Sequence, residues 1–257
     1  MTVLITGASS GIGLELARIF AAHGYDVILA ARHEDRLRAL AAELTGQVRA
    51  HVVPVDLAAA GAAASLVERV QALGVDVDVL VNNAGFGVYG AFIETSLDTE
   101  LSMIRLNIVA LTELTKRLLP AMVARKRGRI LNVASTAAFF PGPLTAVYYA
   151  TKAYVLSFSE AIANELEGTG VTVTALCPGP TESGFQAAAR LEESKLVAGR
   201  KLPTSREVAQ EGYDALMSGK AVAVAGLSNK VQVLAPRLFP RRMIASVVRA
   251  AQERRIK

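Results

Sequence analysis

The chain has 257 residues, of which 52% are hydrophobic and 20% charged, so it can bury a large core and lacks the composition of a disordered protein. Its one cysteine, Cys177, excludes an internal disulfide and suits a reducing compartment, where we expect it to be a small buried hydrophobic residue. The formal net charge of +5 is uneven: residues 230–257 hold eight Lys or Arg and one acid, which leaves residues 1–229 at −2.

Apolar runs alternate with amphipathic stretches along the chain. The predicted strands are Val3–Thr6, Asp26–Ala30, Ala50–Val55, Val77–Val81, Arg129–Val133, Val171–Leu176 and Ala221–Ala225. The predicted helices are Gly11–His23, Glu34–Leu44, Ala60–Leu73, Thr99–Arg125, Val147–Glu167 and Arg206–Ser218. Near-continuous hydrophobic strands between helices are typical of a parallel sheet buried on both faces. We therefore predict an α/β fold, a single doubly wound domain with a seven-stranded parallel sheet flanked by helices on both faces.

The first predicted strand leads into a glycine-rich turn, TGASSGIG, at residues 6–13. Such a turn lets the backbone approach a pyrophosphate, and the following helix offers free N–H groups to it. The serines can bind phosphate oxygens or cap the helix, and glycines can also serve close packing alone. The position after the first strand favours a phosphate site, although the glycine spacing is wider than G-x-G-x-x-G. The candidate contacts are Gly7, Ser9, Ser10, Gly11, Ile12 and Gly13.

The end of the second strand indicates which dinucleotide binds. NAD enzymes usually carry an acidic residue there, which binds the ribose 2′-hydroxyl. Here the strand ends Ala30-Ala31-Arg32, without an acid. Arg32 can pair with a 2′-phosphate, and Arg36 is a second candidate one turn later. We therefore predict NADP(H), the alternative being an ordinary surface arginine.

Tyr148 and Lys152 lie four residues apart in a predicted helix, so they share a face. An ammonium beside a phenol should lower the tyrosine pKa and make it a general acid or base. Tyr149, three residues before Lys152, fits the same argument, so the spacing does not choose between the two tyrosines. Ser135 follows the fifth strand. Taken alone, it would be an ordinary loop serine or helix cap. Asn107 lies in an apolar helix, where it needs hydrogen-bond partners.

Taken together, Thr6–Gly13, Asn82-Asn83-Ala84-Gly85, Asn107, Ser135 and the pair Tyr148…Lys152 resemble the short-chain dehydrogenase/reductase (SDR) family, which has a Rossmann fold. The resemblance covers roughly residues 1–185. It implies that Tyr148 is the catalytic acid or base and that Ser135 orients the substrate carbonyl. It also implies that Lys152 binds the nicotinamide ribose and that Asn107 holds a water in a proton relay, the alternative being a structural asparagine.

The same resemblance extends to further cofactor contacts. Asp56 and Leu57 match the position beside the adenine, and Asn83 and Gly85 match the segment beside the adenosine ribose. Thr181 and Ser183 match the loop that holds the carboxamide, with Ser183 standing where the family often has threonine. No histidine has metal-ligand spacing and Ser135 has no histidine partner, so neither a metal site nor hydrolase chemistry is predicted.

Three aromatic-rich segments are expected to face the substrate: Phe86–Phe92, Phe139–Val147 and Phe185–Pro203, the last a candidate lid. They favour an apolar ketone or aldehyde, with ordinary packing under loops as the alternative. The predicted function is thus NADP(H)-dependent interconversion of a carbonyl and an alcohol. The alternative is a non-catalytic NADP-binding regulatory protein on the same fold.

The end of the chain differs from the remainder in charge. We divide the protein into a catalytic domain, 1–228, and a basic helical extension, 229–257, packed on or near it. Amphipathic helices are expected there, interrupted at Pro236 and Pro240. The basic residues either form a solvated face or contact a membrane surface or an acidic carrier. We expect a homodimer or homotetramer, no nucleic acid and, because no signal segment precedes the first strand, a cytoplasmic location.

Overall fold

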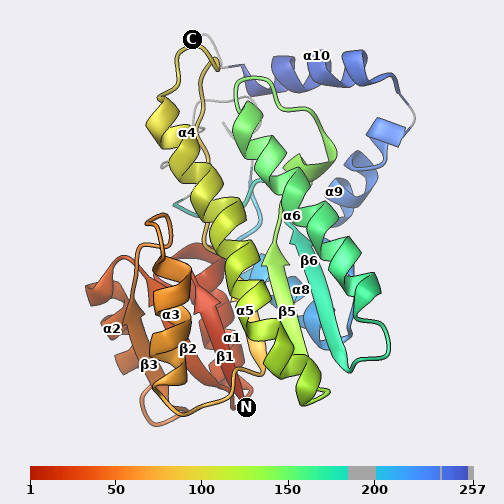
Figure 1. Ribbon diagram of the computed structural model, residues 1–257. Coiled ribbons are helices and arrows are strands. Elements are labelled where there is room, and N and C mark those ends of the chain that lie inside the picture. Colours follow the sequence, from red (N-terminus) through yellow and green to blue (C-terminus); the bar gives the residue numbers. More distant parts are fainter. Residues whose placement is uncertain (185–200, 238, 254–257) are drawn as a thin grey trace.

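The computed structural model describes residues 1–184, 201–237 and 239–253 (Figure 1). Its centre is a parallel sheet of seven strands in the order β3-β2-β1-β4-β5-β6-β7. The strands are β1 Thr2–Thr6, β2 Asp26–Ala31, β3 Ala50–Pro54, β4 Val79–Asn82, β5 Gly128–Val133, β6 Val171–Cys177 and β7 Val222–Val224. The predicted doubly wound sheet is thereby confirmed. Between β1 and β4 the strand order reverses, which is where such sheets bind ligands.

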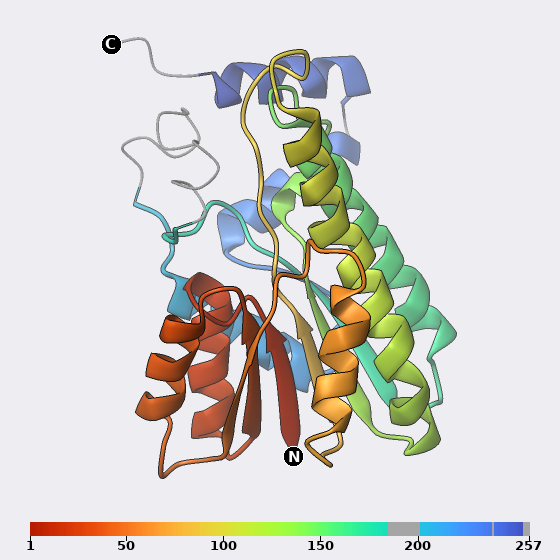
Figure 2. The same ribbon diagram turned by 60° about the vertical axis from the view of Figure 1, so that its left-hand side comes forward.

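Helices cover both faces of the sheet, as Figures 1 and 2 show. They are α1 Gly11–Ala22, α2 Glu34–Glu43, α3 Ala62–Gln71, α4 Leu97–Ile104, α5 Leu111–Ala124, α6 Ala146–Glu165, α8 Ser205–Met217, α9 Leu227–Gln232 and α10 Arg241–Gln252. Side chains alternate between the faces of β1, so that Val3 and Ile5 pack with α1 and α8, while Leu4 packs with α3 and α5. Both faces of the sheet are therefore buried.

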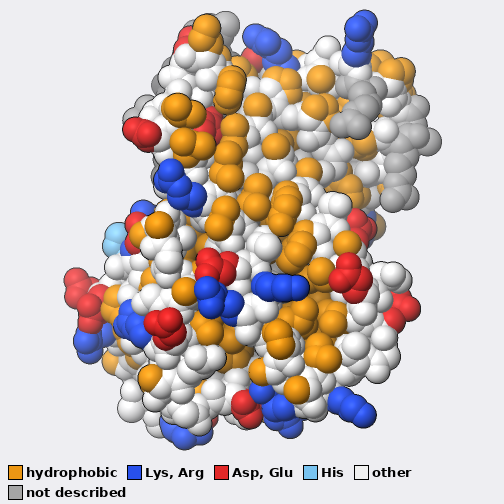
Figure 3. Space-filling model, viewed as in Figure 1, with side chains coloured by type: hydrophobic (Ala, Val, Ile, Leu, Met, Phe, Trp, Pro, Cys, Tyr) orange, Lys and Arg blue, Asp and Glu red, His pale blue; other side chains and the backbone are white. Residues whose placement is uncertain are grey.

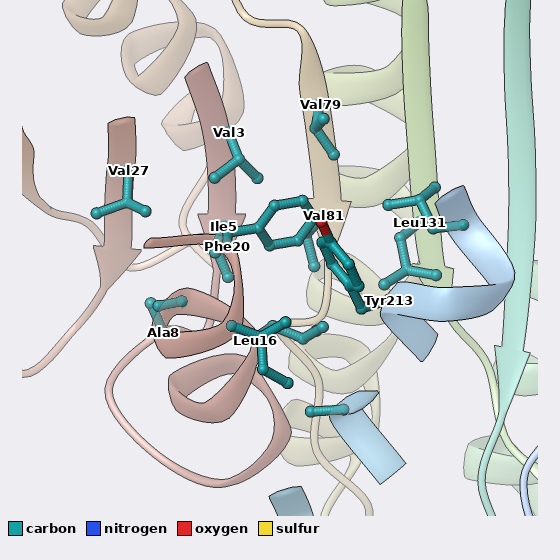
Figure 4. Packing of buried hydrophobic residues seen from close by; sticks show 14 of the residues in the cluster. Val3, Ile5, Ala8, Leu16, Phe20, Val27, Val79, Val81, Leu131 and Tyr213 are labelled. Carbon is teal, nitrogen blue, oxygen red and sulfur yellow. The ribbon is translucent and has the colours of Figure 1, made fainter. Parts of the chain in front are cut away.

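Figure 4 shows the hydrophobic core on the face of the sheet that α1 and α8 cover. The Phe20 ring of α1 meets the Tyr213 ring of α8 edge to face, with ring centroids 5.1 Å apart. Leu16, one turn before Phe20, is fully buried in the same cluster. This packing fixes α1, and with it the glycine-rich turn, against the carboxyl end of β1.

The predicted helix Thr99–Arg125 is continuous in the structure, from Leu97 to Ala124, but it is not α-helical throughout. The structure has α4, then a π-helical segment, Arg105–Ala110, then α5. Asn107 lies inside the π-helical segment, and its amide is hydrogen-bonded to the backbone of Phe86. Apolar periodicity does not reveal one wider turn, which is why the sequence reads as a single α-helix.

The described part of residues 229–257 is helical with breaks near both prolines, and its separation from the catalytic domain stays a prediction. α9 ends at Gln232, a 3₁₀ turn covers Ala235–Arg237, and Pro240 precedes α10. In Figure 2, α10 lies across the end of the molecule toward which the strands run. Within the described ranges, none of the helices combines the length and the apolar character needed to cross a membrane.

Candidate active site

A cavity of about 750 Å³ opens at the carboxyl ends of the strands. It is lined by both the glycine-rich turn after β1 and the polar residues around the start of α6. All the sequence-predicted site residues line it except Gly13 and Asn107: Gly7, Ser9, Ser10, Gly11, Ile12, Arg32, Asp56, Leu57, Asn83, Gly85, Ser135, Tyr148, Lys152, Thr181 and Ser183. Residues far apart in sequence are thus brought to one place at the switch point of the sheet.

The glycine-rich turn depends on two kinds of glycine. Gly7 and Gly11 have φ of +67° and +57°, a region that side chains disfavour. Gly13 is instead buried behind the turn, where a Cβ would collide with the carbonyl oxygen of Gly7 and the amide of Asn83. Close packing also applies to Gly7, where a Cβ would lie 2.8 Å from Asn83 Nδ2, whereas Gly11 has room; both Gly7 and Gly11 line the cavity.

Asn83 braces the turn from β4. Its Nδ2 donates to the carbonyl oxygens of Thr6, at 2.9 Å, and Gly7, at 3.2 Å. The Thr6 hydroxyl in turn accepts hydrogen bonds from the backbone N–H groups of Asn83 and Ala84. Sequence reasoning missed this role of Thr6, because nothing local to the turn marks its partners about 77 residues away.

The two serines of the turn lie at the start of α1. Ser10 is the N-cap residue, but its hydroxyl makes no capping hydrogen bond, so the capping alternative is wrong for Ser10. Both serines line the cavity, and Ser10 is exposed. The α1 N-terminus, with its partial positive charge and no acidic residue in its first turn, faces the same space.

Arg32 and Arg36 border the cavity just after β2. Both side chains are exposed, and neither forms an ion pair with any residue in the described ranges. Arg38, which lies on α2 with Arg36, differs because its Nε donates to Glu34 at 2.9 Å. Two guanidinium groups without an ion-pair partner among the described residues therefore lie at the cavity, where a phosphate could reach them.

The other predicted cofactor contacts lie along the cavity rim. The Asp56 carboxylate accepts a hydrogen bond from the N–H of Ala58 at 3.0 Å, and Leu57 is buried in the core. A Cβ on Gly85 would lie 3.0 Å from Asn107 Oδ1 and 3.5 Å from Lys152 Nζ, so the backbone passes close to both side chains there. The Thr181 hydroxyl donates to the carbonyl oxygen of Gly179 at 2.9 Å.

Ser135, Tyr148 and Lys152 come together at the centre of the cavity. Ser135 Oγ accepts from the N–H of Ala137 at 3.1 Å, and so also caps a short 3₁₀ helix, Thr136–Phe139. It is hydrogen-bonded to Tyr148 as well. Lys152 is buried; its Nζ donates to the carbonyl oxygen of Val133 at 2.7 Å and lies 5.9 Å from the centroid of the Tyr148 ring.

The pKa values of Tyr148 and Lys152 are shifted in a different way from that expected from the sequence. Burial raises the pKa of Tyr148 to about 12, and the hydrogen bond with Ser135 only partly opposes it. Burial lowers the pKa of Lys152 to about 8. The prediction that Lys152 lowers the tyrosine pKa is wrong for the protein alone, because Nζ points to a backbone carbonyl and because the loss of solvation is the larger effect.

The second tyrosine, Tyr149, also lines the cavity but makes different contacts. The Tyr149 ring packs so closely on Gly142 that a Cβ there would overlap it. Its hydroxyl is hydrogen-bonded to Gln252 of α10, and burial raises the pKa of Tyr149. Of the two tyrosines that the spacing left open, Tyr148 is the one hydrogen-bonded to Ser135 and with its ring beside Lys152.

Asn107 lies behind the cavity and is 2% exposed. Its Oδ1 accepts from the N–H of Phe86 at 3.2 Å, and its Nδ2 donates to the carbonyl oxygen of Phe86 and to Thr151 Oγ1, both at 3.0 Å. Thr151 Oγ1 in turn donates to the carbonyl oxygen of Tyr148 at 2.7 Å. The asparagine thus connects the segment after β4 to the helix that bears Tyr148.

The predicted substrate segments are only partly at the cavity. Phe86 and Phe140 line it, whereas Phe92 is 69% exposed and Phe139 packs in a separate core cluster. Residues 185–200 of the predicted lid lie outside the described residues. α10 contributes to the lining, which the sequence did not indicate. In the described ranges, no group of three or more His, Cys, Asp or Glu side chains could hold a metal ion.

A dinucleotide-sized cavity that joins a glycine-rich turn to a Ser-Tyr-Lys group is typical of Rossmann-fold oxidoreductases. The family model described as short chain dehydrogenase matches residues 1–194. The chain is 33% identical to dehydrogenase/reductase SDR family member 7B of Rattus norvegicus over 99% of this chain and 83% of that protein. It is 36% identical to the ketoacyl reductase HetN of a Nostoc species over 79% of this chain and 71% of that protein.

The fold agrees with these relatives. A short-chain dehydrogenase from Sphingobium yanoikuyae, solved in complex with NADPH, superposes with a TM-score of 0.81 at 30% identity. The superposition covers 99% of this chain and 98% of that one. The chain belongs to the short-chain dehydrogenase family of oxidoreductases, and the resemblance found in the sequence is confirmed.

Proposed function

We propose that this protein is an NADP(H)-dependent oxidoreductase that interconverts a ketone or aldehyde and the corresponding alcohol, with Tyr148 as general acid and base. The observation that carries the proposal is the Ser135–Tyr148–Lys152 group in the same cavity as the glycine-rich turn. A reductase needs a proton donor beside a dinucleotide site, and this cavity joins the two.

Tyr148 is suited to donate a proton in the reduction. With its pKa raised to about 12 by burial, the phenol stays protonated at neutral pH. Its proton would pass to the substrate oxygen, while Ser135 donates a hydrogen bond to the same oxygen and polarises the carbonyl. A bound nicotinamide cofactor supplies the hydride that reaches the carbonyl carbon. In the reverse direction the phenolate would accept the alcohol proton.

Lys152 and Asn107 have supporting roles in this proposal. The buried ammonium of Lys152 would hold the nicotinamide ribose hydroxyls and replenish the tyrosine proton. Asn107 acts as a positioning residue, because it contacts Phe86 and Thr151 rather than lining the cavity. The relay water predicted for Asn107 stays a prediction.

The preference for NADP(H) is supported by charge at the end of β2. Arg32 and Arg36 border the cavity with no ion-pair partner in the described part of the chain, and Ala31 occupies the position where an acid would hold a 2′-hydroxyl. The remaining proposed cofactor contacts are Gly7, Ser9, Ser10, Gly11, Ile12, Gly13, Asp56, Leu57, Asn83, Gly85, Thr181 and Ser183 around the same space.

The direct test is turnover with a panel of ketones and aldehydes under NADPH. We expect NADPH oxidation with the wild type, and at least about a 100-fold loss of kcat in Tyr148→Phe with the NADPH Kd unchanged, since a positioned general acid contributes roughly 10²–10⁴-fold. Tyr149→Phe is the matched control and should retain kcat within a few-fold. A wild type that binds NADPH but reduces no carbonyl would instead support the non-catalytic alternative.

A second copy of this chain is the proposed partner. Figure 3 shows apolar side chains gathered over α5 and α6. Val109, in the π-helical segment just before α5, is 51% exposed, and Tyr154 of α6 is 37% exposed. We propose that this face is covered in a homodimer or homotetramer, which light scattering of Val109→Asp against wild type would test. Contact of the basic extension with a membrane or an acidic carrier, and the cytoplasmic location, stay predictions.

A further inference from the structure

The substrate end of the cavity is bounded by one face of α10. Ile244, Val247, Val248 and Ala251 all line it. Their spacing of three, four and seven residues places them on the same side of the helix. We call these four residues the α10 wall. The opposite side of α10 carries the exposed residues Arg242, Ser246 and Arg249.

The α10 wall encloses space instead of packing into a core. Ile244 is buried, but Val247 is 61% exposed although it lines the cavity. Phe86 and Phe140 line the same cavity from other segments. Apolar surface is therefore left open at this end of the cavity, and burying it against an apolar ligand is favourable.

One buried side chain holds α10 in place. Gln252, the last residue of the helix, is 1% exposed. Its Nε2 donates to Thr145 Oγ1 at 2.7 Å, and its side chain is hydrogen-bonded to Tyr149. Its carbonyl oxygen accepts from the Tyr89 hydroxyl at 3.0 Å. Three contacts from two distant segments thus converge on this residue.

These contacts connect α10 to the proposed catalytic helix. Thr145 is the N-cap of α6, three residues before Tyr148 and seven before Lys152. A buried amide that loses its partners is strongly disfavoured, so the hydrogen bonds of Gln252 favour one position of α10. The position of the α10 wall is therefore coupled to the position of the catalytic residues.

We propose that Gln252 is a positioning residue that holds the α10 wall over the substrate end of the cavity, and that this wall selects carbonyl compounds with a long apolar chain or ring system. The inference rests on the proposed function for its substrate. A charged substrate tail would lose its hydration against the wall without gaining a partner from it.

The position of α10 can be tested without turnover, by hydrogen exchange of full-length protein. In Gln252→Ala we expect the amides of residues 241–252 to exchange at least about 10-fold faster than in wild type, while β1 and β4 keep their protection. Thr145→Val should have the same effect, to a smaller degree. Unchanged exchange of α10 in Gln252→Ala would overturn the role of Gln252.

Substrate selection is tested with 2-undecanone and 2-butanone as probes. Val247→Asp places a charge on the α10 wall and should lower the ratio of kcat/KM for 2-undecanone to that for 2-butanone by about 10-fold or more, because removing apolar contacts from a pocket costs roughly 10–200-fold. Ser246→Asp adds the same charge on the outer side and should leave the ratio unchanged. Gln252→Ala should raise KM for 2-undecanone more than it lowers kcat.

The two proposals fail in different ways. Suppose that the wild type reduces 2-butanone, and that either it does not prefer 2-undecanone or Val247→Asp leaves that preference unchanged. Substrate selection by the α10 wall is then wrong, and the reductase proposal stands. If the wild type reduces neither ketone nor any other carbonyl, the proposed function fails, and the hydrogen-exchange result still decides whether Gln252 holds α10.

Discussion

Lys152 Nζ lies 5.9 Å from the centroid of the Tyr148 ring and donates its hydrogen bond to the carbonyl oxygen of Val133. The ammonium thus lies near the phenol ring and is hydrogen-bonded to the backbone. Burial acts on both groups in the direction that disfavours charge: it raises the pKa of Tyr148 to about 12 and lowers that of Lys152 to about 8. A phenol that stays protonated, beside an ammonium group whose pKa is lowered, fits proton donation to a carbonyl.

This arrangement predicts the pH dependence of reduction. As pH rises through about 8, the free enzyme loses the Lys152 charge, while Tyr148 stays protonated up to about 12. We therefore expect kcat/KM for NADPH-dependent ketone reduction to fall above an apparent pKa near 8, because kcat/KM reports the groups of the free enzyme. A profile that stays level to pH 9.5 would contradict this assignment.

The same lysine should make the fold less stable at neutral pH. Because its folded pKa is about 8 against an ordinary 10.5, the folded protein binds fewer protons than the unfolded chain between these values, so its stability rises with pH in that window. Lys152→Met should increase the free energy of unfolding at pH 7 by about 1–3 kcal/mol, the charge penalty less the lost bond to Val133. Urea unfolding should show this gain shrinking between pH 8 and 10.5; a gain independent of pH would assign it to packing instead.

The two arginines after β2 should discriminate the cofactors. Removing charge-assisted hydrogen bonds to a 2′-phosphate costs about 1.5–3 kcal/mol, so Arg32→Ala should weaken NADPH binding about 10–100-fold and leave NADH binding unchanged. Arg36→Ala should have a smaller effect. Arg38→Ala is the matched control, because Arg38 is already paired with Glu34 on the same helix. Fluorescence titration of both cofactors measures this, and equal losses for NADPH and NADH would refute the 2′-phosphate role.

Gly13 should be intolerant of any side chain. A Cβ there collides with the Gly7 carbonyl and the Asn83 amide, both fixed by the turn they form. We expect Gly13→Ala to destabilise the protein by about 1–3 kcal/mol, the usual cost of overpacking, and to weaken cofactor binding. Gly184→Ala, where a Cβ meets nothing within 4 Å, is the stability control. Thermal unfolding that does not separate the two variants would show that the turn can shift.

Much of the fold is readable from the sequence, because strands buried on both faces give continuous apolar runs. Even so, β4 begins at Val79, two residues later than predicted, although the backbone of Asp78 is already hydrogen-bonded to Thr2 and Arg129 of the neighbouring strands. Side-chain chemistry with fixed local spacing, such as Tyr148 and Lys152, is also visible.

Contacts between distant segments are not readable in this way. Gln252 meets Thr145 and Tyr89, which are 107 and 163 residues away, and no periodicity links them. The pKa shifts were unpredictable for a similar reason: the sequence places Lys152 near Tyr148, but only the structure reveals that Lys152 is buried, that Tyr148 is half-buried at the cavity and that Nζ bonds to Val133.

Asn107 makes another contact between distant segments. Its hydrogen bonds to Phe86 and Thr151 join the segment after β4 to the helix that carries Tyr148. Asn107→Leu would leave the Phe86 N–H and carbonyl groups without this partner, whereas Thr151 Oγ1 keeps its bond to the Tyr148 carbonyl. At about 1–3 kcal/mol for each unpaired group, we expect a loss of about 2–4 kcal/mol in the free energy of unfolding. kcat should fall while the NADPH Kd changes little, because Asn107 does not line the cavity. Thr151→Val and Thr151→Ser form the matched pair: the first removes the hydroxyl between Asn107 and the Tyr148 carbonyl, the second keeps it. If both Thr151 variants lose kcat equally, shape rather than hydrogen bonding positions Tyr148.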